Sequence, residues 1–412
     1  MASGIICEYN PFHKGHLYHI EATRRLSGDP DIICIMSGNY TQRGEPAITD
    51  KWTRTRMALA TGADLVIELP TYYSTASASD FAFGAVRLAC CTGLIRHLSF
   101  GVEPDSLPVL PALSSLLSSR ASTMDEAIRS ALHQGLSYPQ ARESAIRALA
   151  QDAGLSLPPT FFSPNAILGL EYLLQLQQAS SRFSFVPAPL LVPRRSSGYH
   201  DLDPEAEFPS ASALRRLLLQ SEDITDRLPS DVQDIWADAL RLGRAPVLPD
   251  TFSPFLQAAL LRHSADSLRR VIGVREGLEH RILQQSASYP SWSVLLDRLA
   301  TKRYPTASLR RVLLNILLDI TQERRAAAGF SDGPAYLRIL GFRREKETLL
   351  RQLCANAALP VISSLSQLPS LSPSAAQALQ DEISFTDLYL AGLPDPSGTG
   401  RGFEYRAGLI RF

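Results

Sequence analysis

Short apolar runs alternate with amphipathic stretches through the first half of the chain. Each run is compact, apolar and followed by turn residues, which is typical of a strand buried on both faces of a sheet. The four clearest runs lie at residues 5–7, 31–36, 63–69 and 97–102. The segments between them are long enough for helices, one of which we expect to begin after an N-cap at Asp50. Strands separated by helix-length segments imply right-handed crossovers, so the pattern predicts a parallel sheet.

The pattern changes along the rest of the chain. Between the fourth strand and residue 220 we expect helices over 123–155 and 163–178, a strand over 182–192 and a helix after Pro209. Beyond residue 220 the strand pattern disappears. The apolar spacing there predicts helices over 256–261, 294–299, 309–318, 337–353 and 375–379, with a Pro/Ser-rich connector over 359–374. We therefore expect an α/β protein, with a Rossmann-like parallel-sheet domain over residues 1–220 and a mostly α-helical domain over residues 221–412.

The composition is that of a globular protein without overall charge. Of the 412 residues, 45% are apolar and 20% are charged, and 41 Lys and Arg balance 41 Asp and Glu. This balance excludes recognition of a polyanion through net charge alone. Residues 261–351, however, hold 17 Lys and Arg against 9 Asp and Glu. That local surplus fits a nucleic-acid-binding face or a set of solvated helices, and charge alone favours the solvated helices.

The cysteines and the lengths of the apolar runs indicate the cellular compartment in which the protein is found. Cys7, Cys34, Cys90, Cys91 and Cys354 are odd in number and lack the paired spacing of a metal site. No stretch resembles a signal peptide, and no apolar run approaches the ~18 residues that span a bilayer. We therefore expect a cytoplasmic protein with reduced thiols and no membrane association.

The candidate chemistry begins where the first strand ends. Asn10-Pro11 breaks that strand and the segment from Gly15 onward has helical spacing, so His13, Gly15 and His16 fall at a helix start. Free backbone N–H groups and the positive end of the helix dipole make such a place suited to anions. Two imidazoles add N–H donors, and Gly15 lets a phosphate approach the backbone. The strand, the His-x-Gly-His turn and the helix together predict a nucleotide-phosphate site.

Two other interpretations of these histidines stay open on the local sequence. His13 and His16 share one face of a helix, as a metal-binding pair would, but no third ligand stands at a matching spacing. They are also compatible with hydrogen-bonded turn residues that take no part in chemistry. The Asn-Pro turn and the buried strand before the pair favour the phosphate site.

Further candidates follow other strands or begin other helices. Ligands of parallel sheets bind beyond the carboxyl ends of the strands, where Gly101 and the pair Arg194-Arg195 fall. Asn165, at the start of a helix, is a candidate for contact with adenine or ribose. The alternatives are a solvated arginine pair and an ordinary hydrogen bond at a helix start.

Ser210 and Arg215 lie at and just after another helix start. The ordinary interpretation is an N-cap followed by a surface arginine. Together with the His-x-Gly-His turn, a second helix N-terminus with an arginine also suits the pyrophosphate that leaves a nucleoside triphosphate.

A basic cluster lies in the helical region. It consists of Lys302, Arg303 and Tyr304, followed by Arg310 and Arg311 on an amphipathic helix. Such sets bind RNA phosphates and stack bases, but they are equally common on exposed helices. By itself the cluster does not decide between the two.

Several stretches in order along the chain resemble the bacterial tRNA(Met) cytidine acetate ligases, a family of the His-x-Gly-His nucleotidyltransferase superfamily. The matching stretches are residues 4–16 (GIICEYNPFHKGH), 37–46 (SGNYTQRGEP), 100–103, 163–165, 194 with 198–200, 210–212 and 301–304. The first two stretches together are the most specific. The resemblance extends from about residue 4 to about residue 350.

The resemblance implies an ATP-dependent ligase. In this family acetate attacks the α-phosphate of ATP to give acetyl-adenylate and pyrophosphate, and the acetyl group passes to N4 of the wobble cytidine of elongator tRNA(Met). His13 and His16 would be catalytic, with Mg²⁺ held mainly by the phosphates. By family correspondence the residues expected at the ATP site are Ile6, Cys7, Glu8, Tyr9, Asn10, Pro11, Phe12, His13, Lys14, Gly15, His16, Leu17, Tyr18, His19, Gly101, Asn165 and Arg194. The local patterns described above add Arg195, Ser210 and Arg215. Those expected at tRNA are Lys302, Arg303, Arg310 and Arg311.

Two other functions remain in competition. A small-molecule adenylyltransferase with a helical accessory domain would use the same phosphate site, but a small substrate does not need about 190 further residues. An RNA-binding protein with a degenerate nucleotide site is the other alternative, and intact His13, Gly15 and His16 argue against it. No obligate protein partner is inferred.

Overall fold

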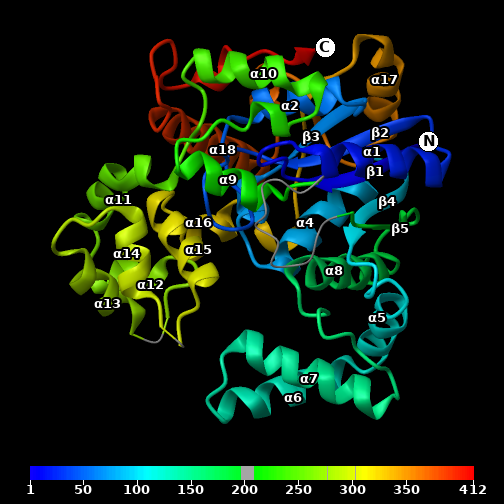
Figure 1. Cartoon of the computed structure of the whole chain (residues 1–412), viewed down its shortest axis with the longest axis vertical. Helices are drawn as coiled ribbons and strands as arrows, with labels where there is room; N and C mark the ends of the chain where they lie inside the picture. Colours follow the sequence, from blue (N-terminus) through cyan, green and yellow to red (C-terminus); the bar gives the residue numbers. More distant parts are fainter. Residues whose placement is uncertain (196–207, 276, 302) are drawn as a thin grey trace.

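A largely parallel sheet forms the centre of the molecule (Figure 1). The computed structural model describes residues 1–195, 208–275, 277–301 and 303–412. Its strands are β1 (Ala2–Cys7), β2 (Asp31–Ser37), β3 (Leu65–Leu69), β4 (Ile95–Val102), β5 (Ala188–Pro193), β6 (Leu337–Phe342), β7 (Val361–Ile362) and β8 (Ile410–Arg411). Within the described residues they form one eight-stranded sheet in the order β5-β4-β1-β2-β3-β6-β7, with β8 beside β6. The first five strands are parallel, which confirms the predicted α/β, Rossmann-like class.

The central strands are buried on both faces, which explains their continuous apolar runs. In β1, Ile5 and Cys7 join one apolar cluster, and Ile6 between them joins the cluster on the other face. β2 alternates in the same way, with Cys34 on the first face and Ile35 on the second. A strand that faced water on one side would carry polar residues at every second position, and these strands do not.

Helices cover both faces of the sheet. α1 (Lys14–Ser27), α2 (Lys51–Ala60) and α10 (Ser230–Arg241) pack into the apolar cluster of Ile5, whereas α4 (Ala78–Cys91) and α8 (Pro164–Ala179) pack into that of Ile6. Asp50 caps α2 as predicted, because its Oδ1 accepts hydrogen bonds from Trp52 N and Thr53 N at 3.0 and 2.9 Å.

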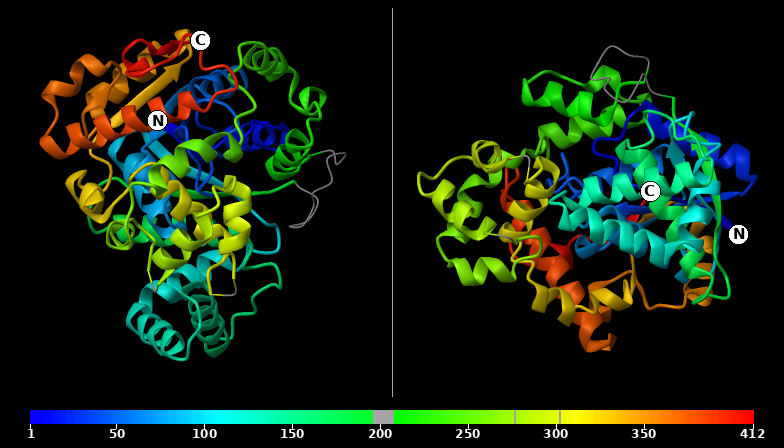
Figure 2. Two further views of the ribbon diagram at one scale, coloured as in Figure 1. Left: turned by 90° about the vertical axis from the view of Figure 1, so that its left-hand side faces the viewer. Right: turned by 90° about the horizontal axis from the view of Figure 1, so that it is seen from below.

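Two groups of helices extend away from the sheet (Figures 1 and 2). α6 (Ala121–His133) and α7 (Tyr138–Asp152) form a hairpin that follows α5 (Leu110–Ser119). The single helix expected over 123–155 is therefore broken, at a turn where Gly135 has a φ of +88°. The second group is α11 (Ser253–Leu260), α12 (Ala265–Arg270), α13 (Leu278–Ser286), α14 (Trp292–Leu299) and α15 (Thr306–Leu317).

The remaining elements are short, apart from one long C-terminal helix. They are α3 (Thr71–Ser74), α9 (Ala211–Leu219), α16 (Gln322–Ala327), α17 (Glu347–Asn356) and α18 (Pro373–Ala391), with 3₁₀ turns η1 (Thr225–Arg227), η2 (Pro249–Phe252), η3 (Phe330–Asp332), η4 (Arg344–Lys346), η5 (Leu365–Ser370) and η6 (Phe403–Tyr405). None of the helices in the described part of the chain is long and apolar enough to cross a membrane.

The prediction of a helix over 337–353 is wrong. Residues 337–342 form β6, which pairs antiparallel with β3, and a helix, α17, begins only at Glu347. The run Leu-Arg-Ile-Leu-Gly-Phe has no clear period, and pairing with β3 decides its conformation. β7 and β8 are likewise strands beyond residue 220, where none was expected. The domain boundary at residue 220 stays a prediction.

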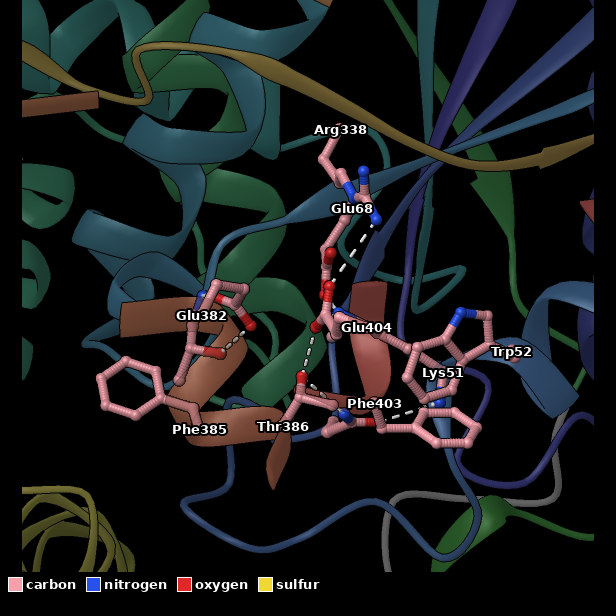
Figure 3. A network of polar contacts seen from close by, with 12 residues as sticks. Lys51, Trp52, Glu68, Arg338, Glu382, Phe385, Thr386, Phe403 and Glu404 are labelled. Carbon is pink, nitrogen blue, oxygen red and sulfur yellow. Dashed lines mark hydrogen bonds and ion pairs between the residues drawn. The ribbon is translucent and has the colours of Figure 1, made fainter. Parts of the chain in front are cut away.

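A buried polar network attaches the C-terminal segment to the sheet (Figure 3). Lys51 Nζ lies 2.7 Å from Glu68 Oε1 on β3 and 2.5 Å from Glu404 Oε1 on η6. Thr386 Oγ1 on α18 also donates to Glu404 Oε1, at 2.5 Å. Glu382 of α18 accepts from Thr71 Oγ1 at 2.6 Å, and burial together with nearby Glu68 raises the pKa of Glu382 to about 8. One lysine thus joins β3, α2 and the end of the chain.

Lys51→Met should destabilise the fold strongly. Removing one partner of a buried ion pair leaves the other charge uncompensated, so we expect a loss of about 3–5 kcal/mol in the free energy of unfolding, measured in urea. Arg351→Met is the control, because Arg351 pairs with Glu347 on the surface of α17, where such pairs contribute about 1 kcal/mol or less. Equal small losses for both variants would contradict this role for Lys51.

Candidate active site

The candidate site lies at the carboxyl ends of β1 and β4. The chain runs from β1 through β2 and β3 on one side, and through β4 and β5 on the other, so the strand order reverses between β1 and β4. Gly101 of β4 and Arg194, directly after β5, meet at this edge. Arg194 N donates to Val102 O at 2.9 Å, and a Cβ on Gly101 would lie 3.2 Å from Arg194 Cγ. Gly101 therefore lets the Arg194 side chain lie close to the strand.

The loop between β1 and α1 is held from both sides. Asn10 Oδ1 accepts from Ile48 N at 2.7 Å, and Asn10 O accepts from Arg215 Nη1 at 2.7 Å. Tyr9 has a φ of +50°, and its ring packs on Phe12 with centroids 4.7 Å apart. These contacts fix the position from which α1 begins.

The two histidines cap α1 and fix each other's tautomer. His13 Nδ1 accepts from Gly15 N at 3.0 Å, and His16 Nδ1 accepts from His13 N at 3.2 Å. The rings lie 3.7 Å apart between centroids. Because Nδ1 of each neutral ring is an acceptor, the ring proton is on Nε2. Both imidazoles therefore present an Nε2–H donor at the start of the helix.

Both histidines stay neutral at physiological pH. Burial, followed by the charges of Arg194 and Arg215, lowers the pKa of His13 from its ordinary 6.5 to about 3. Burial and nearby His13 lower the pKa of His16, and burial and Arg194 lower that of His19 to about 4. The site thus offers neutral donors surrounded by permanent cations, which suits a polyanion.

Arg194 and Arg215 supply that positive charge. Burial lowers the pKa of Arg215 to about 10 and also lowers that of Arg194, and in both cases nearby Arg43 adds to the effect. Arg43 was part of the motif 37–46 but was not among the predicted site residues. Its exposed side chain follows β2, and its only sequence signal is its place in that motif.

Asn165 is oriented by a residue that the sequence predictions also left out. Its Nδ2 donates to Glu103 Oε1 at 3.0 Å, so the side-chain carbonyl of Asn165 remains an acceptor. Glu103 Oε2 is buried and has no hydrogen-bond partner among the residues described. Glu103 stands two residues after Gly101, at the end of β4. The rule that placed Gly101 at a ligand-binding strand end could therefore have identified Glu103 as well.

Three more predicted residues lie on or against α1. Tyr18 and His19 belong to the helix, and Arg195 follows β5. His19 Nε2 is 2.9 Å from Ser99 Oγ on β4, which ties α1 to that strand. The Arg195 guanidinium lies over the Tyr18 ring, 4.6 Å from its centroid. The predicted pair Arg194-Arg195 is thus divided, with Arg194 beside the histidines and Arg195 on Tyr18.

The other predicted residues have differing surroundings. Ser210 is the N-cap of α9, with Oγ accepting from Ala213 N at 3.1 Å, so a role in ATP binding stays a prediction. Of the predicted residues 6–17 other than the two histidines, the buried ones that support the loop are Ile6, Cys7, Tyr9, Asn10, Pro11 and Phe12. Glu8, Gly15 and Leu17 are half-buried, and Lys14 is exposed.

The predicted tRNA-binding residues are only partly together. Lys302 lies outside the described residues. Arg303 is exposed, with its guanidinium 5.8 Å from the Tyr304 ring. Arg310 Nη1 on α15 lies 3.0 Å from Glu45 Oε1, and burial lowers the pKa of the neighbouring Arg311. The basic helix therefore touches the loop that follows β2, at the edge of the candidate site.

His13 should make stability depend on pH. The unfolded chain takes up a proton below the ordinary pKa of 6.5, whereas the folded protein does not until about pH 3, so stability falls as the pH falls between these values. His13→Asn removes this titration and keeps an N-cap acceptor. Between pH 7 and pH 5, the free energy of unfolding in urea should fall by about 2 kcal/mol more in the wild type than in His13→Asn. Parallel pH curves would contradict a neutral His13.

Comparison with known proteins extends over the whole chain. The model of the family described as HIGH Nucleotidyl Transferase matches residues 1–400. The tRNA(Met) cytidine acetate ligase of Acetivibrio thermocellus is 34% identical over 414 residues, covering 99% of each chain. That of Syntrophomonas wolfei is 35% identical over 413 residues, covering 98% of this chain and 97% of its own.

Solved structures agree with the sequence relatives. The crystal structure of Thermotoga maritima TmcAL bound with alpha-thio ATP matches this fold with a TM-score of 0.91 at 27% identity, with 100% of both chains covered. The apo form of the same protein also gives a TM-score of 0.91, at 28% identity, over 100% of this chain and 99% of its own. The motif resemblance is thereby confirmed, and the chain belongs to the tRNA(Met) cytidine acetate ligase family of HIGH nucleotidyl transferases.

Proposed function

We propose that this protein uses ATP to activate acetate and transfers the acetyl group to N4 of the wobble cytidine of elongator tRNA(Met). The observation that carries the proposal is the pair of neutral Nε2–H donors of His13 and His16 at a helix start, near the charges of Arg194 and Arg215. The name of the family, tRNA(Met) cytidine acetate ligase, supports tRNA(Met) as the acetyl acceptor. The Thermotoga maritima relative with the same fold was crystallised with an ATP analogue.

The first step is adenylation. A carboxylate oxygen of acetate forms a bond to the α-phosphorus, the bond from that phosphorus to the bridging oxygen breaks, and pyrophosphate leaves with the electron pair. Negative charge grows on the phosphates as this happens. His13, His16 and the α1 N–H groups are donors placed to stabilise it, with Arg194 and Arg215 as the compensating charges.

The second step is aminolysis of the acetyl-adenylate. N4 of cytidine forms a bond to the acetyl carbonyl carbon, AMP leaves with the electron pair, and N4 loses a proton. No protein nucleophile takes part in either step. The basic cluster on and before α15 is our candidate tRNA platform, since α15 touches the loop beside the site.

ATP would enter this site with Mg²⁺, which supplies charge neutralisation on the phosphates. The described residues contain no group of three His, Cys, Asp or Glu side chains that is suited to a metal ion. The phosphates rather than the protein would therefore hold the ion, and Arg194, Arg215 and the histidines would bind the remaining phosphate oxygens. We propose a cytoplasmic location, where tRNA and ATP are found.

Incubation with ATP, Mg²⁺, radiolabelled acetate and bulk bacterial tRNA should place the label in N4-acetylcytidine, found by nucleoside analysis, only when ATP is present.

His16→Ala should slow acetate-dependent ATP–pyrophosphate exchange by about 100-fold or more, because a phosphate donor is lost, and should leave tRNA affinity nearly unchanged. His133→Ala, in the exposed helix α6, is the control. AMP retained on a small molecule, with no label in tRNA, would instead identify a small-molecule adenylyltransferase.

Lys302→Ala combined with Arg303→Ala should weaken tRNA binding. Losing two phosphate contacts should also flatten the dependence of log K on log salt by about 1 to 2 units, measured by filter binding at several salt concentrations. A double variant of exposed arginines on α10 and α17, Arg241→Ala with Arg351→Ala, should change neither quantity. Unchanged tRNA affinity in the first variant would move the RNA site elsewhere.

A further inference from the structure

A tight hairpin over residues 40–46 presents Arg43 beside the candidate active site. Tyr40 and Pro46 form an antiparallel bridge, Thr41 N donates to Glu45 O at 3.0 Å, and Gly44 N donates to Thr41 O at 2.9 Å. Arg43 therefore occupies the tip of a turn whose backbone is closed by its own hydrogen bonds. The backbone on both sides of Arg43 is fixed by these hydrogen bonds, whereas the Arg43 side chain is exposed.

The inner side of this hairpin is attached to the loop that carries the histidines. Gln42 N donates to Glu8 Oε1 at 2.7 Å. Glu8 directly follows β1 and stands five residues before His13. The position of Arg43 is therefore set by the same loop that places the two imidazoles.

The outer side of the hairpin packs closely on α15. A Cβ on Gly44 would lie 2.5 Å from Arg311 N and 2.7 Å from the Arg310 carbonyl carbon, and Gly44 has a φ of +76°, so only glycine fits there. Glu45 next to it pairs with Arg310 at 3.0 Å. The hairpin tip is thus fixed between the β1–α1 loop and α15.

Arg43 has charge but no partner in this setting. Among the residues described, its guanidinium has neither a carboxylate within ion-pair distance nor a hydrogen-bond partner. Its charge reaches both Arg194 and Arg215, whose pKa values it helps to lower. Glu103 is the carboxylate that acts on Arg194, and Glu45 and Glu8 are those that act on Arg215. Arg43 adds a further positive charge on a closed turn, and a bound anion would compensate it.

The sheet order indicates which part of the nucleotide Arg43 meets. Gly101, Asn165 and Glu103 lie on the β4 side of the histidines and offer backbone access, an amide and a carboxylate, which suit a nucleoside. Arg43 follows β2, on the opposite side of β1, where Arg215 also reaches the β1–α1 loop. A nucleotide bound with its nucleoside on the β4 side would extend its phosphates past His13 and His16 toward the side of Arg43.

We propose that Arg43 is a further phosphate-binding residue of this site, which binds the β- and γ-phosphates of ATP and the pyrophosphate that leaves. The proposal rests on the proposed function and adds a residue to its first step. When the bond between the α-phosphorus and the bridging oxygen breaks, the electron pair stays on the pyrophosphate. The Arg43 N–H groups donate to that oxygen-rich group and compensate its charge.

The test compares nucleotides that differ in phosphate number. Affinities for ATP, AMP and inorganic pyrophosphate are measured by calorimetry for the wild type, Arg43→Ala and Arg43→Lys, with thermal melting to show that each is folded. We expect Arg43→Ala to weaken ATP and pyrophosphate about 10- to 100-fold and AMP less than about 2-fold, and Arg43→Lys to recover part of the loss. Arg351→Ala is the control, because α17 follows the end of β6 at the opposite edge of the sheet.

Two results would overturn the role of Arg43. An equal loss of affinity for AMP and ATP would mean that the substitution deforms the pocket. Normal ATP and pyrophosphate affinity, with weakened tRNA binding, would assign Arg43 to the RNA instead. A wild-type protein that binds ATP but transfers no acetate to tRNA would refute the proposed function, and would leave the nucleotide comparison for Arg43 valid.

Discussion

The hydrogen bond from Gly15 N to His13 Nδ1 is the contact on which the geometry of the candidate site depends. It begins α1, and it commits the ring proton of His13 to Nε2. The bond from His13 N to His16 Nδ1 does the same for the second ring. A helix cap thereby becomes a pair of oriented donors. A Ser or Asp cap would begin the helix equally well but would supply no N–H group of this kind.

The charge around these donors is arranged so that the imidazoles need not be protonated. Burial and the neighbouring arginines keep His13 neutral, and Arg194 and Arg215 provide permanent positive charge. The arginines remain cationic across the physiological range, so the positive charge of the candidate site does not depend on histidine titration. Neutral rings also avoid mutual repulsion at the 3.7 Å separation of their centroids.

Distant parts of the chain meet at the candidate site and across the sheet behind it. α15, from the region expected to bind tRNA, touches the hairpin after β2 through the Glu45–Arg310 pair. β6 returns to the sheet beside β3, and Lys51 ties Glu68 of that strand to Glu404 near the end of the chain. The N-terminal sheet and the C-terminal segment therefore share one buried network (Figure 3). The helical region contacts the edge of the candidate site directly through the Glu45–Arg310 pair.

Local sequence determined most of the strands and helices of the N-terminal half of the chain. The apolar runs of β1 to β4, the Asp50 cap and the His-x-Gly-His turn all follow from neighbours a few residues apart. The parallel sheet and the position of the two histidines at a helix start were therefore predictable. Three features were not. β6 is a strand because β3 pairs with it, and its sequence has no period that reveals this. Glu103 lies beside Asn165, and the hairpin that carries Arg43 lies beside Glu8, through contacts between separate strand ends. Arg195 lies on Tyr18, apart from the histidines. The sequence by itself therefore determined the elements and the donors, because their causes are local; the tertiary structure decided which charges surround them, because those charges come from strands and helices that meet only on folding.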